Sequence, residues 1–227
     1  CIEVVDEEKH LGTLLGYVSC VKRIDDAVHS FLTKVNHLKC HFKTLPVHTM
    51  YTLFKTHCMS LYSSPMWDLS HPSITTFHVA WRKAIRKVLD LPYCTHSRIL
   101  NLICDDLPID AQLHVRFHKF LVSLHTSSNP VTQLCTELAL SGSGSSVSNN
   151  ISSLSTILNM SRTDTVHCNS SSVHSKFFSI YSNQIDPTMA THALLIHDLL
   201  NMKFDAITNR TIDLSDICHS ITFYSLV

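Results

Sequence analysis

Apolar residues recur at helical spacing from residue 25 onward. The first run has intervals of three or four positions and comprises Ala27, Phe31, Val35, Leu38 and Phe42. Such intervals place side chains on one face of an α-helix. Asp25 and Asp26 stand just before this run, where an N-cap and the helix dipole favour acidic side chains. The pattern therefore predicts a helix that begins at Asp25 and ends before Pro46.

The same spacing predicts further helices over residues 50–62, 72–89, 98–104 and 109–125. In the third helix of the chain the predicted inner face is Ile74, Phe77, Trp81, Ala84, Ile85, Val88 and Leu89. Large aromatic side chains at such positions are more often core residues than surfaces for stacking bases. We therefore expect Trp67 and Trp81 to be buried in a helical bundle over residues 25–125.

The two ends of the chain have a different character. Residues 1–24 contain two short runs rich in β-branched and apolar residues, with Gly12 and Gly16 near turns, and predict a β-hairpin. Residues 126–187 are rich in serine and lack periodicity, which predicts a flexible linker. Residues 188–227 predict one more amphipathic helix and a weakly specified tail. The expected fold class is mainly α, with a small N-terminal hairpin.

Charge is unevenly distributed along the chain. The formal net charge of the 227 residues is zero, but residues 34–120 carry eleven lysines and arginines against five aspartates and glutamates. A local excess of positive charge favours contact with a polyanion. A set of solvated helix faces explains the same excess, and the sequence leaves both interpretations open.

Several classes of protein fit the sequence poorly. No apolar run approaches the roughly 20 residues of a membrane-spanning helix, and the N-terminus does not resemble a signal peptide. Nine cysteines without short regular spacing favour free thiols in a reducing compartment. We therefore expect an intracellular protein, cytoplasmic or nuclear and not secreted. Because the chain begins with Cys1 rather than Met, we also expect it to be a fragment.

The seventeen histidines and the paired aspartates are the candidates for metal binding or catalysis. His37-x-x-Cys40 is one half of a zinc motif without a second half, and His114 and His118 share a helix face without the glutamate of a zincin helix. Asp105-Asp106 superficially resembles a catalytic aromatic-x-Asp-Asp turn, but no aromatic residue stands two positions before it. Helix capping is therefore the favoured interpretation of this pair. We therefore predict no catalytic residue, no metal ligand and no bound cofactor.

Four stretches, taken in order, resemble a known family. They are Lys9–Gly12 (KHLG), Phe54–Tyr62 (FKTHCMSLY), Ala80–His96 (AWRKAIRKVLDLPYCTH) and Leu107–Leu113 (LPIDAQL). Together they resemble the region that follows the catalytic core in the reverse transcriptases of LINE-type (non-LTR) retrotransposons, which are RNA-directed DNA polymerases. The resemblance covers roughly the first 125 residues.

The resemblance implies roles for particular residues. His10, Leu11 and Gly12 would lie in a hairpin at the edge of the palm, where the primer end is held. Residues from Asp25 to about Leu89 would form the thumb, which grips an RNA or RNA–DNA duplex through its backbone. The residues expected to contact phosphates are Arg82, Lys83, Arg86 and Lys87, followed by Lys39 and Lys43.

The resemblance also implies that this chain alone does not polymerise DNA. In the family, an aromatic-x-Asp-Asp turn that helps to hold two Mg²⁺ ions precedes the hairpin, and this sequence contains no such turn before His10. Its partners would be the nucleic acid and the palm and fingers of the parent polymerase, with no membrane involved. Two alternatives stay open: a non-catalytic helical interaction module, and a relic of a truncated element without function.

Overall fold

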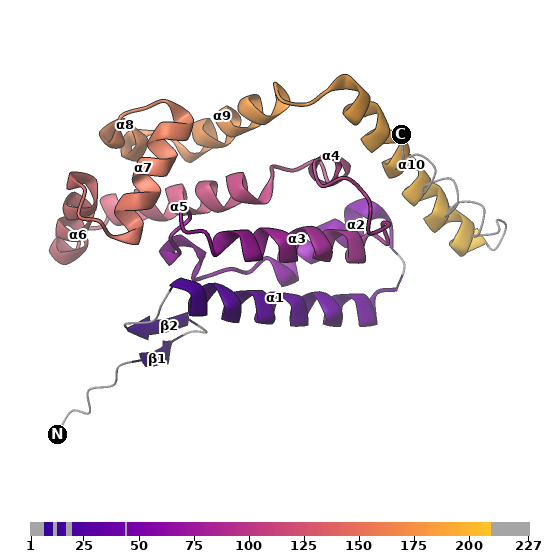
Figure 1. Ribbon diagram of the computed structural model, residues 1–227, viewed down its shortest axis with the longest axis horizontal. Coiled ribbons are helices and arrows are strands. Elements are labelled where there is room, and N and C mark those ends of the chain that lie inside the picture. The colour runs from indigo at the N-terminus through magenta and orange to yellow at the C-terminus, as the bar shows by residue number, and fades with distance from the viewer. Residues whose placement is uncertain (1–6, 11–12, 17–19, 44, 210–227) are drawn as a thin grey trace. The chain divides into compact units, whose positions relative to one another are not determined.

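The computed structural model is mainly helical, as the sequence predicts (Figure 1). It describes residues 7–10, 13–16, 20–43 and 45–209, with side chains over 20–43 and 45–202. The α-helices of these residues are α1 Cys20–His41, α2 Val47–Leu53, α3 Ile74–Val88, α4 Ile99–Ile103, α5 Ile109–His125, α6 Pro130–Ser141, α7 Ser146–Leu158, α8 Arg162–His167, α9 Ser170–Ser182 and α10 Pro187–Asn209.

Two short strands precede the helices. β1 (Glu7–His10) pairs antiparallel with β2 (Thr13–Gly16), and His10 stands opposite Thr13 in the register. Leu11 and Gly12, predicted to hold a primer end together with His10, lie outside the described residues.

The first helix starts earlier than predicted. α1 begins at Cys20, so Asp25 and Asp26 are exposed residues inside the helix, and the predicted N-cap at Asp25 is wrong. The reason is that Ile24, which is fully buried, extends the apolar face one turn closer to the N-terminus. Phe31, Val35 and Leu38 continue that face and are buried as predicted, whereas Phe42 follows the helix and is exposed.

The predicted helix over residues 50–62 is interrupted. α2 ends at Leu53 and is followed directly by a π-helical turn, η1 (Phe54–Cys58). The backbone N–H of Met59 donates to the carbonyl of Phe54 at 3.3 Å. The wider turn buries Phe54 and Cys58, and burial raises the pKa of the Cys58 thiol to about 11. Tyr62, the last residue of this predicted helix and expected on its buried face, is 85% exposed because the helical register ends before it.

The serine-rich segment over residues 126–187 is not a flexible linker, and that prediction is wrong. It forms α6, α7, α8 and α9, whose ends are capped by the same small polar residues that suggested disorder. The side chains of Asn129, Ser145 and Ser161 accept hydrogen bonds from backbone N–H groups in the first turns of α6, α7 and α8. Because such residues cap helices well and serve poorly inside them, they separate four short helices.

Buried side chains anchor this segment as well. Ile151, Leu154 and Phe177 are fully buried. Asn150 is also fully buried, and its amide accepts from the backbone N–H of Leu69 at 2.8 Å and donates to the carbonyl of Trp67 at 2.7 Å. A buried amide with both ends satisfied fixes α7 against the chain around Trp67.

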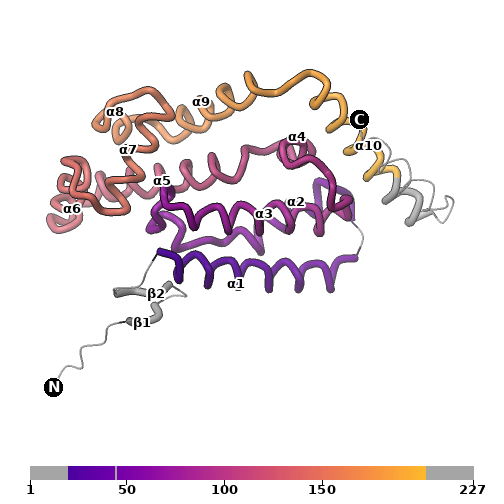
Figure 2. Tube along the Cα trace, viewed as in Figure 1, coloured from indigo at the N-terminus to yellow at the C-terminus, as the bar shows by residue number. Residues whose placement is uncertain are grey.

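The chain divides into two compact units, each built from three separate stretches. The first unit comprises residues 1–28, 61–78 and 108–182, and the second comprises residues 29–60, 79–107 and 183–227. In the first unit, α5 contacts α6, α8 and α9, and a 3-10 turn, η2 (Ser64–Met66), contacts α5. In the second unit, α10 contacts α4, near which it begins in Figure 2, and also contacts α2. The predicted boundaries at residues 24, 125 and 187 do not follow this division.

Candidate nucleic-acid interface

Helix α3 has one buried face and one basic face, as predicted. Phe77, Trp81 and Ile85 are among its buried residues, and the prediction that Trp67 and Trp81 are core residues is confirmed. The basic residues Lys83 and Lys87 are exposed, whereas Arg82 and Arg86 are half-buried. The four cations therefore differ in how much of each side chain reaches solvent.

Arg86 has a structural role within the second unit. Its guanidinium donates to the carbonyl of Thr95 from Nε at 3.0 Å and from Nη2 at 2.7 Å, and to the hydroxyl of Ser97 at 3.0 Å. Burial, followed by the positive charge of Arg82 one turn away, lowers the pKa of Arg86 from its usual value. Arg86 thus holds the loop that follows α3 and leaves few of its donors for a ligand.

Two other predicted cations are also engaged. Lys87 Nζ donates to the side-chain oxygen of Asn36 at 2.6 Å. Lys39 Nζ lies 2.6 Å from Oδ2 of Asp90, with which it forms a salt bridge. Both contacts connect α1 to the end of α3 within the second unit. Neutralised by its partner, Lys39 attracts a polyanion less than the sequence suggested.

The remaining predicted cations are available. Among residues with described side chains, no acceptor contacts the side chains of Arg82, Lys83 or Lys43. Arg82 also stands one turn from Arg86, so two like charges lie on the same side of α3. Unneutralised cations held close together are stabilised by a bound anion. The structure thus divides the six predicted residues into three available and three engaged cations.

The net charge of the chain around the basic face of α3 also favours the binding of a polyanion there. In the second unit, residues 29–60 and 79–107 hold nine lysines and arginines against three aspartates. Two of these aspartates, Asp90 and Asp106, already bond lysines. Positive charge therefore predominates over this part of the second unit.

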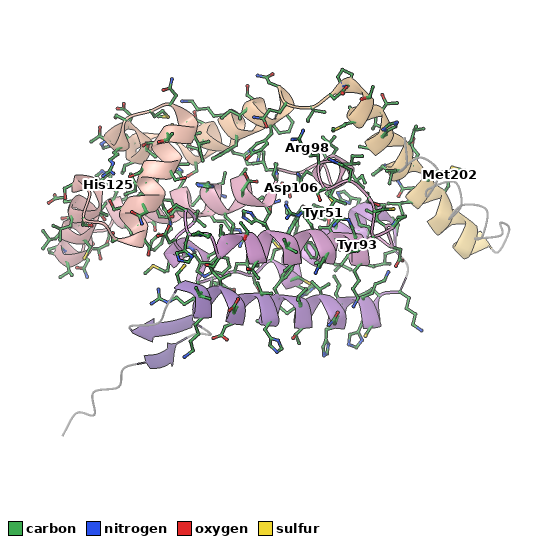
Figure 3. The ribbon with its side chains drawn as sticks, viewed as in Figure 1. Tyr51, Tyr93, Arg98, Asp106, His125 and Met202 are labelled. Carbon is green, nitrogen blue, oxygen red and sulfur yellow. The ribbon has the colours of Figure 1, made fainter. Side chains whose placement is uncertain are left out.

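A polar cluster that the sequence did not suggest surrounds Asp106. Its carboxylate accepts from the hydroxyl of Tyr51 at 2.8 Å and from Nζ of Lys55 at 2.6 Å. Figure 3 labels Asp106 and Tyr51. Its other oxygen accepts from the backbone N–H of Leu107, the next residue. Asp106 does not cap α5, whose N-cap is Pro108, so the capping interpretation is wrong for this residue. The cluster joins α2 to the turn after α4.

The histidines noted in the sequence have separate environments. His118 is fully buried, with Nε2 2.9 Å from the carbonyl oxygen of Thr165 and Nδ1 3.2 Å from the Ser170 hydroxyl. His114 bonds the carbonyl of Asp110 and the hydroxyl of Ser153 in the same manner. Each ring is thus satisfied by its own partners. Within the described residues, no group of three or more His, Cys, Asp or Glu side chains is placed to hold one metal ion.

Over the described residues, no helix combines the length and the apolar character that crossing a membrane requires. Comparisons of the chain with protein-family models, with curated proteins and with solved structures find no match.

Proposed function

We propose that this chain corresponds to the end of the palm, the thumb and the following region of a LINE-type reverse transcriptase, and that it binds nucleic-acid duplexes through their phosphate backbone. The observation that carries the proposal is the basic face of α3, where Arg82 and Lys83 have no acceptor among the residues with described side chains. The sequence resemblance around Ala80–His96 supports the same role. The chain is proposed to be inactive as a polymerase without the parent's Mg²⁺-binding aspartates.

The contacts within the second unit refine which residues do the binding. Arg82, Lys83 and Lys43 are proposed to contact phosphates directly. Arg86 and Lys87 are proposed to position α3 through Thr95 and Asn36. Such contacts recognise the shape and charge of a duplex without reading its bases, which suits the grip of a polymerase on any template.

Exposed apolar side chains fit a chain that is part of a larger protein. On α10, Leu194, Leu195 and Met202 are exposed, and exposed apolar patches often mark a surface that contacts another protein. The palm and fingers of the parent polymerase are the proposed partners.

A salt titration of duplex binding tests the proposal. The full chain is titrated with a fluorescent RNA–DNA hybrid at several salt concentrations, and the logarithm of the binding constant should decrease linearly with the logarithm of the salt concentration. Arg82→Gln/Lys83→Gln should weaken binding and reduce this slope by roughly one to two, since each lost phosphate contact removes about 0.9. Both side chains lack partners in the second unit, so the circular dichroism spectrum should not change.

The matched control removes the same charge from the first unit. Lys119 and Lys176 are exposed on α5 and α9, and Lys119→Gln/Lys176→Gln should leave the salt slope unchanged. Equal effects of the two double variants would contradict a binding site on α3. Absence of binding at low salt would contradict the function as a whole and favour the alternatives, a protein-interaction module or a relic.

A further inference from the structure

Two histidine rings from different helices meet in the first unit. His125 is the last residue of α5, where Figure 3 labels it, and His167 is the last residue of α8. Their ring centroids are 5.0 Å apart and their planes are inclined by 85°. Both side chains are exposed to solvent. The pair thus combines proximity with access from solution.

The separation of the rings suits two ligands of one metal ion. A zinc–nitrogen bond of 2.0–2.1 Å puts each ring centroid roughly 3.2 Å from the ion, so two imidazoles at a tetrahedral angle have centroids roughly 5 Å apart. The observed centroid separation of 5.0 Å agrees with that distance. Imidazole is a common ligand for divalent zinc, copper, nickel and cobalt, and the remaining positions would be taken by water.

The electrostatic environment favours a cation at the same place. His125 ends a helix of 17 residues, and the C-terminal carbonyls of a helix carry a partial negative charge. α8 packs against α5 close by, and His118 holds the two helices together through the carbonyl of Thr165. The two ligands therefore come from elements whose approach is already fixed, which reduces the entropy lost when a metal binds.

We propose that His125 and His167 form a two-histidine site for a divalent transition-metal ion that links the C-terminal end of α5 to α8. The site is independent of the basic face of α3, because both histidines belong to the first unit. A metal that binds the folded state in preference to the unfolded chain stabilises the first unit by linkage.

Co²⁺ is the probe for this site, because its visible absorption distinguishes imidazole from thiolate ligands among the nine cysteines of the chain. The full chain is titrated with Co²⁺ under reducing conditions in a reductant that does not bind metal, and thermal unfolding is followed with and without the ion. We expect an imidazole-type binding step that depends on His125 and His167, together with a higher unfolding temperature with Co²⁺. His125→Gln and His167→Gln should each abolish this step, and the double variant should lose no more than either single variant, as expected for two ligands of one ion.

The control is a second pair of histidine rings. His37 and His41 stand one turn apart on α1, with centroids 5.5 Å apart, and they lie outside the first unit. His37→Gln/His41→Gln removes two histidines and should leave the His125–His167 binding step intact. Additive effects of the two single variants, or a thermal shift that persists without both His125 and His167, would overturn the proposed site.

Discussion

Replacing Trp67 with alanine is expected to lower the free energy of unfolding of the first unit by several kcal/mol and to shift its urea midpoint strongly downward. Trp67 is 1% exposed, and its ring packs edge-on against Phe77 at a centroid distance of 5.2 Å. Truncation of a buried tryptophan typically costs about 3–5 kcal/mol, which is a large part of the 5–15 kcal/mol that stabilises an average domain. Urea unfolding followed by circular dichroism measures the loss and does not depend on tryptophan fluorescence.

Tyr62 provides the matched control for this substitution. It is an aromatic residue of the same unit and 85% exposed, so Tyr62→Ala should change the free energy of unfolding by less than about 0.5 kcal/mol. If the unfolding midpoint of Trp67→Ala matched that of the parent chain, Trp67 would not be a core residue in solution.

Mild acid is expected to destabilise the first unit through two buried histidines. Backbone carbonyls accept from Nε2 of His118 and Nδ1 of His114, and the other nitrogen of each ring faces a serine hydroxyl that can donate, so both rings can be fully bonded as neutral imidazoles. Burial lowers the pKa of both rings below the ordinary value of 6.5, and for His114 the nearby Asp110 opposes the shift. Below pH 6.5 the unfolded chain therefore binds more protons than the native chain, and stability is lost as the pH falls.

The size of the effect follows from linkage. In the interval between pH 6.5 and the native pKa, each histidine contributes up to about 1.4 kcal/mol per pH unit to the slope of stability against pH. His114→Gln/His118→Gln, whose amides can still donate to the carbonyls, should flatten the slope between pH 7 and pH 5. His174→Gln, on the exposed side of α9, should leave it unchanged. A double variant as sensitive to acid as the parent would show that these two rings do not govern the loss.

Both effects concern residues that bond a part of the chain whose order the sequence concealed, since Trp67 bonds Asn150 and His118 bonds Thr165. The helices over residues 126–187 have few long apolar runs, since their buried residues, such as Ile151 and Val173, stand among many serines. A recognisable signal was nevertheless present. Asn129, Ser145 and Ser161 each precede a short stretch of helix and act as its N-cap, and Gly142 and Asn159 adopt the left-handed conformation at helix ends. Repeated caps indicate short helices, whereas an uninterrupted linker needs none.

In the candidate interface, too, the sequence predicted some features of single residues and missed others. The spacing of apolar residues in α3 was sufficient to predict which side is buried and that Arg82, Lys83, Arg86 and Lys87 occupy the other. It could not predict that Arg86 bonds Thr95 and Ser97, or that Lys39 pairs with Asp90, 51 positions along the chain. Periodicity describes one helix at a time, whereas ion pairs depend on which helices and loops become neighbours in the folded chain.

The sequence by itself determined the mainly helical class, the bounds of α5 and the burial of Trp67 and Trp81, because the interval between apolar residues fixes helical faces locally. The tertiary structure decided which cations remain available, that His114 and His118 are satisfied by separate helices, and that His125 meets His167. These arrangements join positions that are distant in the chain. They follow from the packing of helices and not from the pattern within any one of them.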